Sequence, residues 1–196
     1  MKYAKLLCLA VAATALLTGT ASATTLTSPA NTTYTGSVKL VSEGQMTLHN
    51  EFLAPFTCNW SLEGKTESHG AAVTAGGKVV AITMTNCTSS QSISVLNPGS
   101  LQFHTDTESA DGNGDFTLVG FELSLNYPTV GLTCKYGTGT GISLGTLTGS
   151  KTTGSNATVD GSSPQLPVFG SSVFCGKFGT LTGSFQVSTP TYLDVD

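Results

Sequence analysis

Charged residues are scarce in this chain. Only 10% of its 196 residues are Asp, Glu, Lys or Arg, and arginine is absent. From residue 24 onward, six lysines stand against twelve acidic residues, which gives a net charge of −6. Nucleic acid binding requires Lys or Arg clustered against the phosphates. We therefore expect no nucleic acid partner.

Long apolar runs are missing after the N-terminal segment. The first residues, MKYAKLLCLAVAATALLTGTASA, carry two lysines, an apolar run at 6–17 and the small-residue motif ASA at 21–23. This order is typical of a secretory signal peptide, and the run is shorter than the roughly 20 residues that a spanning helix needs. We predict a signal peptide at 1–23. The mature protein is expected to be secreted or at the cell surface, with the periplasm as an alternative, and not transmembrane.

Helix signals are also missing, because no later window combines a 3.6-residue period with caps. Instead, Thr, Val, Phe and Leu alternate with small polar residues, for example at 78–85, 116–125 and 180–187. Such alternation, broken by turns rich in Gly and Asn, is typical of strands. The predicted fold class is all-β, an antiparallel β-sandwich or barrel of many short strands stapled by disulfides.

The expected domain organisation follows from the same pattern. Residues 24–40 are predicted to form an extended N-terminal segment, and residues 41–196 a single all-β domain. FTCNW at 56–60 and LTCKY at 132–136 share the same pattern, with an apolar residue two positions before a cysteine and an aromatic residue two positions after it. The period of two of a strand places these three side chains of each segment on one face. This repetition leaves open an alternative of two similar β modules.

Four cysteines remain after the signal peptide, and an even number in an exported chain indicates two disulfides. Of the three connectivities, we favour Cys58 with Cys87 and Cys134 with Cys175, because each pair encloses one candidate run of strands. A zinc site is the weaker interpretation, since no spacing has the C-x-x-C form.

Residue patterns for catalysis are absent. His49, His69 and His104 have no metal-ligand spacing among them, and no G-x-S-x-G motif occurs. Two disulfides would leave no thiol for a cysteine nucleophile. We therefore predict a protein that is not an enzyme, with no catalytic and no cofactor-binding residues.

One acidic segment is the best candidate for an ion site. Alternating carboxylates and an amide can direct several oxygens to one calcium ion. Phe116 occupies the place where an EF-hand needs Gly, so a solvated acidic turn is the favoured interpretation and calcium the alternative. The candidate ligands are Asp106, Glu108, Asp111, Asn113 and Asp115.

Three stretches resemble a family of small secreted bacterial proteins, the PraB-like alkane oxidation protein activators of pseudomonads and related actinobacterial proteins. They are TLTSPANTTYTGSV at 25–38, the cysteine pattern with GLTCKYG at 131–137, and the ending FCGKFGTLTGSFQVSTPTYLDVD at 174–196. The resemblance covers most of the mature chain. It implies an extracellular or cell-surface protein that assists growth on hydrocarbons, and it supplies no catalytic residues.

Low charge and ample apolar content lead to the same expectation. We predict a non-enzymatic exported accessory protein at the cell surface or an oil–water interface, with exposed Phe, Val and Leu as the contact surface. In the alternative interpretation, Phe52, Phe103 and Phe121 are ordinary core residues.

A second hypothesis is a structural or adhesive surface subunit, fibre-like or pilus-like, which self-associates by strand pairing. It would need an N-terminal segment outside the fold, and residues 24–34 are the candidate because Pro29 interrupts pairing.

Overall fold

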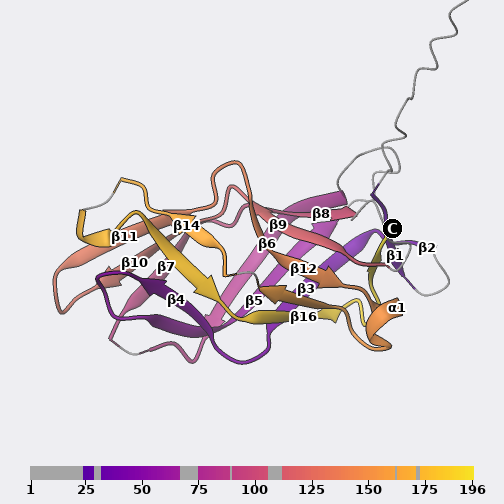
Figure 1. Ribbon diagram of the computed structural model, residues 1–196, viewed down its shortest axis with the longest axis horizontal. Coiled ribbons are helices and arrows are strands. Elements are labelled where there is room, and N and C mark those ends of the chain that lie inside the picture. Colours follow the sequence, from indigo (N-terminus) through magenta and orange to yellow (C-terminus); the bar gives the residue numbers. More distant parts are fainter. Residues whose placement is uncertain are drawn as a thin grey trace, which may run out of the picture.

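The computed structural model describes residues 24–28, 32–66, 75–88, 90–105, 112–161, 163–170 and 173–196 (Figure 1). These residues form β-strands almost throughout, together with a four-residue helix, α1 (Ser150–Thr153), and a short 3₁₀ turn, η2 (Val173–Cys175). The all-β class expected from the sequence is confirmed. No helix in these ranges is long and apolar enough to cross a membrane.

The strands in chain order are β1 (Leu26–Ser28), β2 (Thr32–Thr33), β3 (Gly36–Ser42), β4 (Met46–Asn50), β5 (Phe56–Thr66), β6 (Ala75–Thr85), β7 (Ser92–Asn97), β8 (Ser100–Thr105), β9 (Gly114–Val119), β10 (Glu122–Tyr127), β11 (Leu132–Gly137), β12 (Ile142–Thr148), β13 (Thr158–Gly161), β14 (Gln165–Pro167), β15 (Phe178–Thr182), β16 (Ser184–Thr189) and β17 (Asp194–Val195).

Eight long strands form a closed antiparallel barrel. Most of them are interrupted midway and so carry two labels; β3 and β4, for instance, pair with successive parts of β5. The chain runs up and down through β3–β4, β5, β6, β7–β8, β9–β10, β11–β12, β13–β14 and β15–β16. Pairing of β16 with β3 closes the wall. Of the two architectures expected from the sequence, the barrel is the observed one.

Side chains alternate between the barrel interior and the outer surface. Along β5, every second residue from Phe56 is buried and those between are partly exposed or exposed, so Cys58 and Trp60 share the inner face, as the period of two predicts. Inside the barrel, Phe103 and Phe116 lie with ring centroids 5.3 Å apart. Burying each such side chain stabilises the fold by about 1.5–3 kcal/mol.

Glycine residues mark several interruptions. Gly183 separates β15 from β16 with φ of +136°, and a Cβ there would lie 2.4 Å from Met46 Sδ. Gly120 stands between β9 and β10 with φ of +67°. These conformations are readily adopted only by glycine. The runs at 116–125 and 180–187 are therefore each divided into two strands.

The first and last strands of the described residues, β1 and β17, meet at one end of the barrel. Leu26 is fully buried, and β1 pairs with β17 and β2. Residues 24–40, expected as an extended segment, thus contain β1, β2 and most of β3. The boundary proposed at 40/41 falls within β3.

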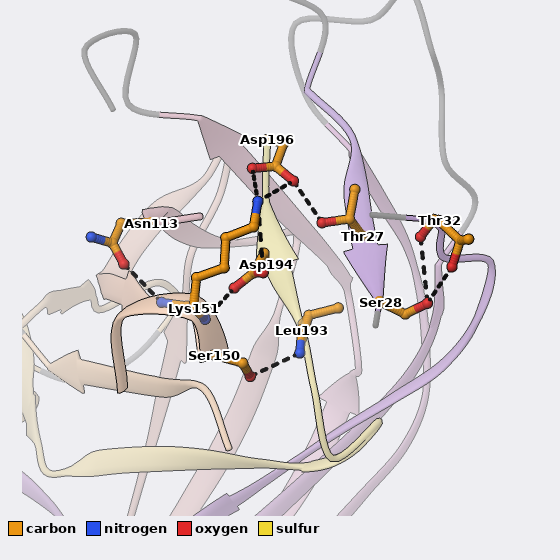
Figure 2. Close-up of polar contacts among 10 residues, drawn as sticks. Thr27, Ser28, Thr32, Asn113, Ser150, Lys151, Leu193, Asp194 and Asp196 are labelled. Carbon is orange, nitrogen blue, oxygen red and sulfur yellow. Dashed lines mark hydrogen bonds and ion pairs between the residues drawn. The ribbon is translucent and has the colours of Figure 1, made fainter. Parts of the chain in front are cut away.

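A polar cluster, the terminal clasp, ties these ends together (Figure 2). It consists of Thr27, Lys151, Asp194 and Asp196. Lys151 Nζ lies 2.9 Å from Asp196 Oδ1 and 3.9 Å from Oδ2 of the fully buried Asp194. The Lys151 backbone N–H donates to Asp194 Oδ1 at 2.9 Å, and Thr27 Oγ1 donates to Asp196 Oδ2 at 2.6 Å. The hydrogen bond to Asp196 is the main reason that the pKa of Lys151 is raised, so its ammonium group is charged at neutral pH.

Replacing Lys151 with Met should lower the free energy of unfolding by about 1–3 kcal/mol, because the buried Asp194 carboxylate loses its only ion pair in the described part of the chain. Urea unfolding followed by Trp60 fluorescence measures the change. Lys65→Met, which removes a charge from an exposed position of β5, is the control and should change stability by less than about 0.5 kcal/mol. Equal effects of the two substitutions would contradict a role for the clasp.

Candidate interaction surface at the apolar end

Exposed apolar side chains gather around the end of β4, the turn from β10 to β11, and η2. In Figure 1, β4, β10 and β11 lie at the end of the barrel away from β1 and β2. Their exposed fractions are high, at 60% for Phe52, 62% for Val130, 83% for Val173 and 67% for Phe174. We call this surface the apolar end and define it by Phe52, Leu53, Val130, Leu132, Val173, Phe174 and Phe178.

Five of these residues come from three separate connections, and the other two, Leu132 and Phe178, begin β11 and β15. Phe52 and Leu53 lie between β4 and β5, Val130 lies in the turn from β10 to β11, and Val173 and Phe174 lie in η2 before β15. Two shallow hollows join them, of about 300 and 480 Å³, and Phe52 lines both. Contacts between distant segments therefore create one continuous apolar surface.

Charge is sparse at this surface. Glu51 and Lys177 line the second hollow, and no charged residue lines the first. Because the two charges have opposite sign, the apolar end as described has no net charge.

Asn50 positions two of the three connections. It is buried, and its Nδ2 donates to the Tyr136 hydroxyl at 3.2 Å and also to the Cys175 carbonyl. Its Oδ1 accepts the Phe52 backbone N–H at 2.9 Å. One side chain thus links the loop that carries Phe52 to the turn that carries Val173.

The two disulfides fasten the same end. Cys134 of β11 is joined to Cys175 of η2, and Cys58 of β5 to Cys87 after β6. This is the pairing that the sequence favoured. Next to the disulfide between Cys58 and Cys87, the Thr88 backbone N–H donates a hydrogen bond to the Thr57 carbonyl at 3.0 Å. The disulfide at Cys175 consequently fixes the turn that carries Val173 and Phe174 to β11.

Two buried tyrosines, Tyr127 and Tyr136, lie beneath the apolar end, where Tyr136 contacts Asn50. Burial raises the pKa of both Tyr127 and Tyr136, and the proximity of Tyr136 adds to the rise at Tyr127. Both phenols are therefore neutral well above physiological pH. Hydrogen bonding from Asn50 acts in the opposite direction on Tyr136 but does not outweigh burial.

The three phenylalanines considered in the sequence analysis divide into two groups. Phe103 and Phe121 are core residues, with 0% and 1% exposed, whereas Phe52 is exposed. Sequence reasoning did not find Val130, Val173 or the other apolar residues of this end. A signal for them exists, because they stand in Gly-, Ser- and Pro-rich connections, where apolar residues are unusual.

The candidate calcium ligands lie mostly outside the described residues. Asp106, Glu108 and Asp111 do so, as does His69. Of the two others, Asn113 Oδ1 accepts the Gly149 N–H at 2.8 Å, and Asp115 is in β9 opposite His104. The described residues contain no group of three or more His, Cys, Asp or Glu that could hold a metal ion. Calcium binding by the acidic turn stays a prediction.

Comparisons with known proteins show no family for this chain. No protein-family model and no curated protein matches the chain. Among solved structures, DynF from the dynemicin biosynthesis pathway of Micromonospora chersina is similar, with a TM-score of 0.46 and 15% identity over 78% of this chain and 79% of that one.

Replacing Asn50 with Ala removes three hydrogen bonds and should lower the free energy of unfolding by about 2–4 kcal/mol. It should also free the loop that carries Phe52, so that limited chymotrypsin digestion cuts after Phe52 faster than in the parent protein. Asn126→Ala, at an exposed position of β10, is the matched control. Unchanged cleavage at Phe52 would show that Asn50 does not order the apolar end.

Proposed function

We propose that this protein is an exported, non-enzymatic accessory protein that adsorbs through its apolar end to a hydrocarbon–water interface. The observation that carries the proposal is the gathering of Phe52, Val130, Val173 and Phe174, each at least 60% exposed, at one end of the barrel. Patches of this kind on soluble proteins mark interaction sites.

Burial energy favours an apolar liquid surface as the partner. Transferring the exposed part of a Phe or Val side chain out of water contributes about 1–2 kcal/mol. Several such side chains on braced loops can enter the surface together, without the ordering cost that a flexible segment pays. No charged residue lines the first hollow, so burying it desolvates no ion, whereas Glu51 and Lys177 at the second hollow are exposed and can keep their charges in water.

The sequence supports the remaining parts of the proposal. A signal-peptide pattern and two disulfides are consistent with export. The resemblance to PraB-like proteins gives hydrocarbon assimilation as the biological setting, and it stays a prediction. The subunit hypothesis is less favoured, since Leu26 and Thr27, part of the proposed N-terminal donor, are paired with β17.

The test is the hexadecane–water interfacial tension measured with protein purified after export, so that both disulfides form. The parent protein should lower the tension faster and further than a neutral control protein of similar size. Phe52→Ser combined with Val173→Ser should weaken adsorption at least about tenfold, because roughly 2–4 kcal/mol of apolar transfer is lost.

The matched control is Val41→Ser combined with Val80→Ser, which removes two exposed valines away from the apolar end. It should adsorb like the parent. If the parent does not exceed the neutral protein, adsorption is the wrong function. If the two double variants lose activity equally, adsorption is real but the apolar end is not its site.

A further inference from the structure

The barrel closes through the pairing of β6 with β8, but over part of its length the wall has a seam, between residues 80–85 of β6 and β7. β6 pairs with β8 only through Ala75–Lys78, and β7 pairs with β10. The hydrogen bond from Val79 N–H to the Gly99 carbonyl, 3.0 Å long, marks the place where the two walls separate. Beyond it, residues 80–85 and 92–97 each have one edge that lacks a ladder partner among the described residues.

The seam is held open by the same bonds that brace the apolar end. Cys87 is joined to Cys58, and Thr88 N–H bonds to the Thr57 carbonyl, so the chain leaving β6 stays beside β5. The following strand, β7, is held on the other side by its ladder with β10. Two strands adjacent in sequence are thereby kept from forming a hairpin.

Each edge lacks the charges and prolines that usually prevent strand addition, although each carries one β-bulge, at Val80 of β6 and at Leu96 of β7, which leaves residues 92–95 as the regular part of the β7 edge. Natural edge strands carry charges, prolines or bulges toward the open side. Residues 80–85 read VAITMT and residues 92–97 read SISVLN, with no charge and no proline. Val80 and Leu96 are 51% and 47% exposed there. The unpaired backbone groups and the lack of charge suit a second β-strand as the partner.

We infer that β7 pairs antiparallel with β7 of a second copy of this chain. An isologous, two-fold pairing is the commonest form of protein dimer, and it brings no like charges together because SISVLN carries none. Residues directly opposite each other in a sheet point to the same face. In a two-fold pairing of identical strands, one residue must therefore lie opposite its own copy, and the two-fold axis runs between these two equivalent residues. Placing it at Ser94 sets Ile93 opposite Val95 of the other copy.

The alternative axis, at Val95, would set Ile93 opposite Asn97 and lose that β-branched contact. Ile93 and Val95 are half-buried and already pack against the barrel core. Pairing about Ser94 therefore extends the existing inner surface across the dimer. This inference does not depend on adsorption by the apolar end.

Light scattering coupled to size-exclusion chromatography, over a wide concentration range, tests the dimer. The parent protein should be a dimer. Ser94→Lys combined with Leu96→Lys places two like charges on the edge and should give a monomer. Thr146→Lys combined with Gln186→Lys, at exposed positions of β12 and β16, which are paired on both sides, should stay dimeric. Thermal unfolding checks that both variants are folded.

A cysteine at the axis gives a second readout. Directly opposed residues have Cα atoms about 4.5–5.5 Å apart, within reach of a disulfide. Ser94→Cys should therefore form a covalent dimer under oxidation, and Gln186→Cys should not. A monomeric parent, or cross-linking no greater at 94 than at 186, would overturn the inference. So would a dimer that only the Phe52→Ser and Val173→Ser variant dissolves, which would assign the contact to the apolar end.

Discussion

The ladder between β16 and β3 is the interaction on which the rest of this structure depends. It joins the last long strand to the first, and through it Leu40 of β3 lies beside Val187 of β16, both fully buried. Without that closure, the alternating inner residues of each strand would not share one interior. Because the contact spans most of the chain, it forms only after distant segments meet, and contacts of this kind slow the folding of β proteins.

Closure also explains why the apolar end differs from the core. In the wall, each inward residue has neighbours on both sides from adjacent strands. At the end of the barrel the chain turns back, and residues such as Phe52 and Val130 lie beyond the last ladder pairs. Asn50 and the bond between Cys134 and Cys175 supply order there by other means. The exposure of these side chains is thus compatible with a well-defined arrangement.

The sequence predicted those properties that depend on local pattern. The period of two assigned Phe56, Cys58 and Trp60 to one face, and the enclosed strand runs indicated which cysteines pair. It did not choose between sandwich and barrel, because that choice depends on the pairing of β16 with β3, residues about 150 apart in the chain. The apolar end was out of reach for the same reason, since Phe52 and Val173 become neighbours only through tertiary contacts.

The two ends of the barrel have opposite chemistry. One end presents apolar loops with few charged residues, and the other holds the ion-paired terminal clasp with both β1 and β17 (Figure 2). Under the proposed adsorption, a molecule with this asymmetry would have a preferred orientation at a boundary between oil and water. In a film, the barrels would stand upright with their C-termini in the aqueous phase, so a group fused after Asp196 would be displayed on the watery side of a coated droplet.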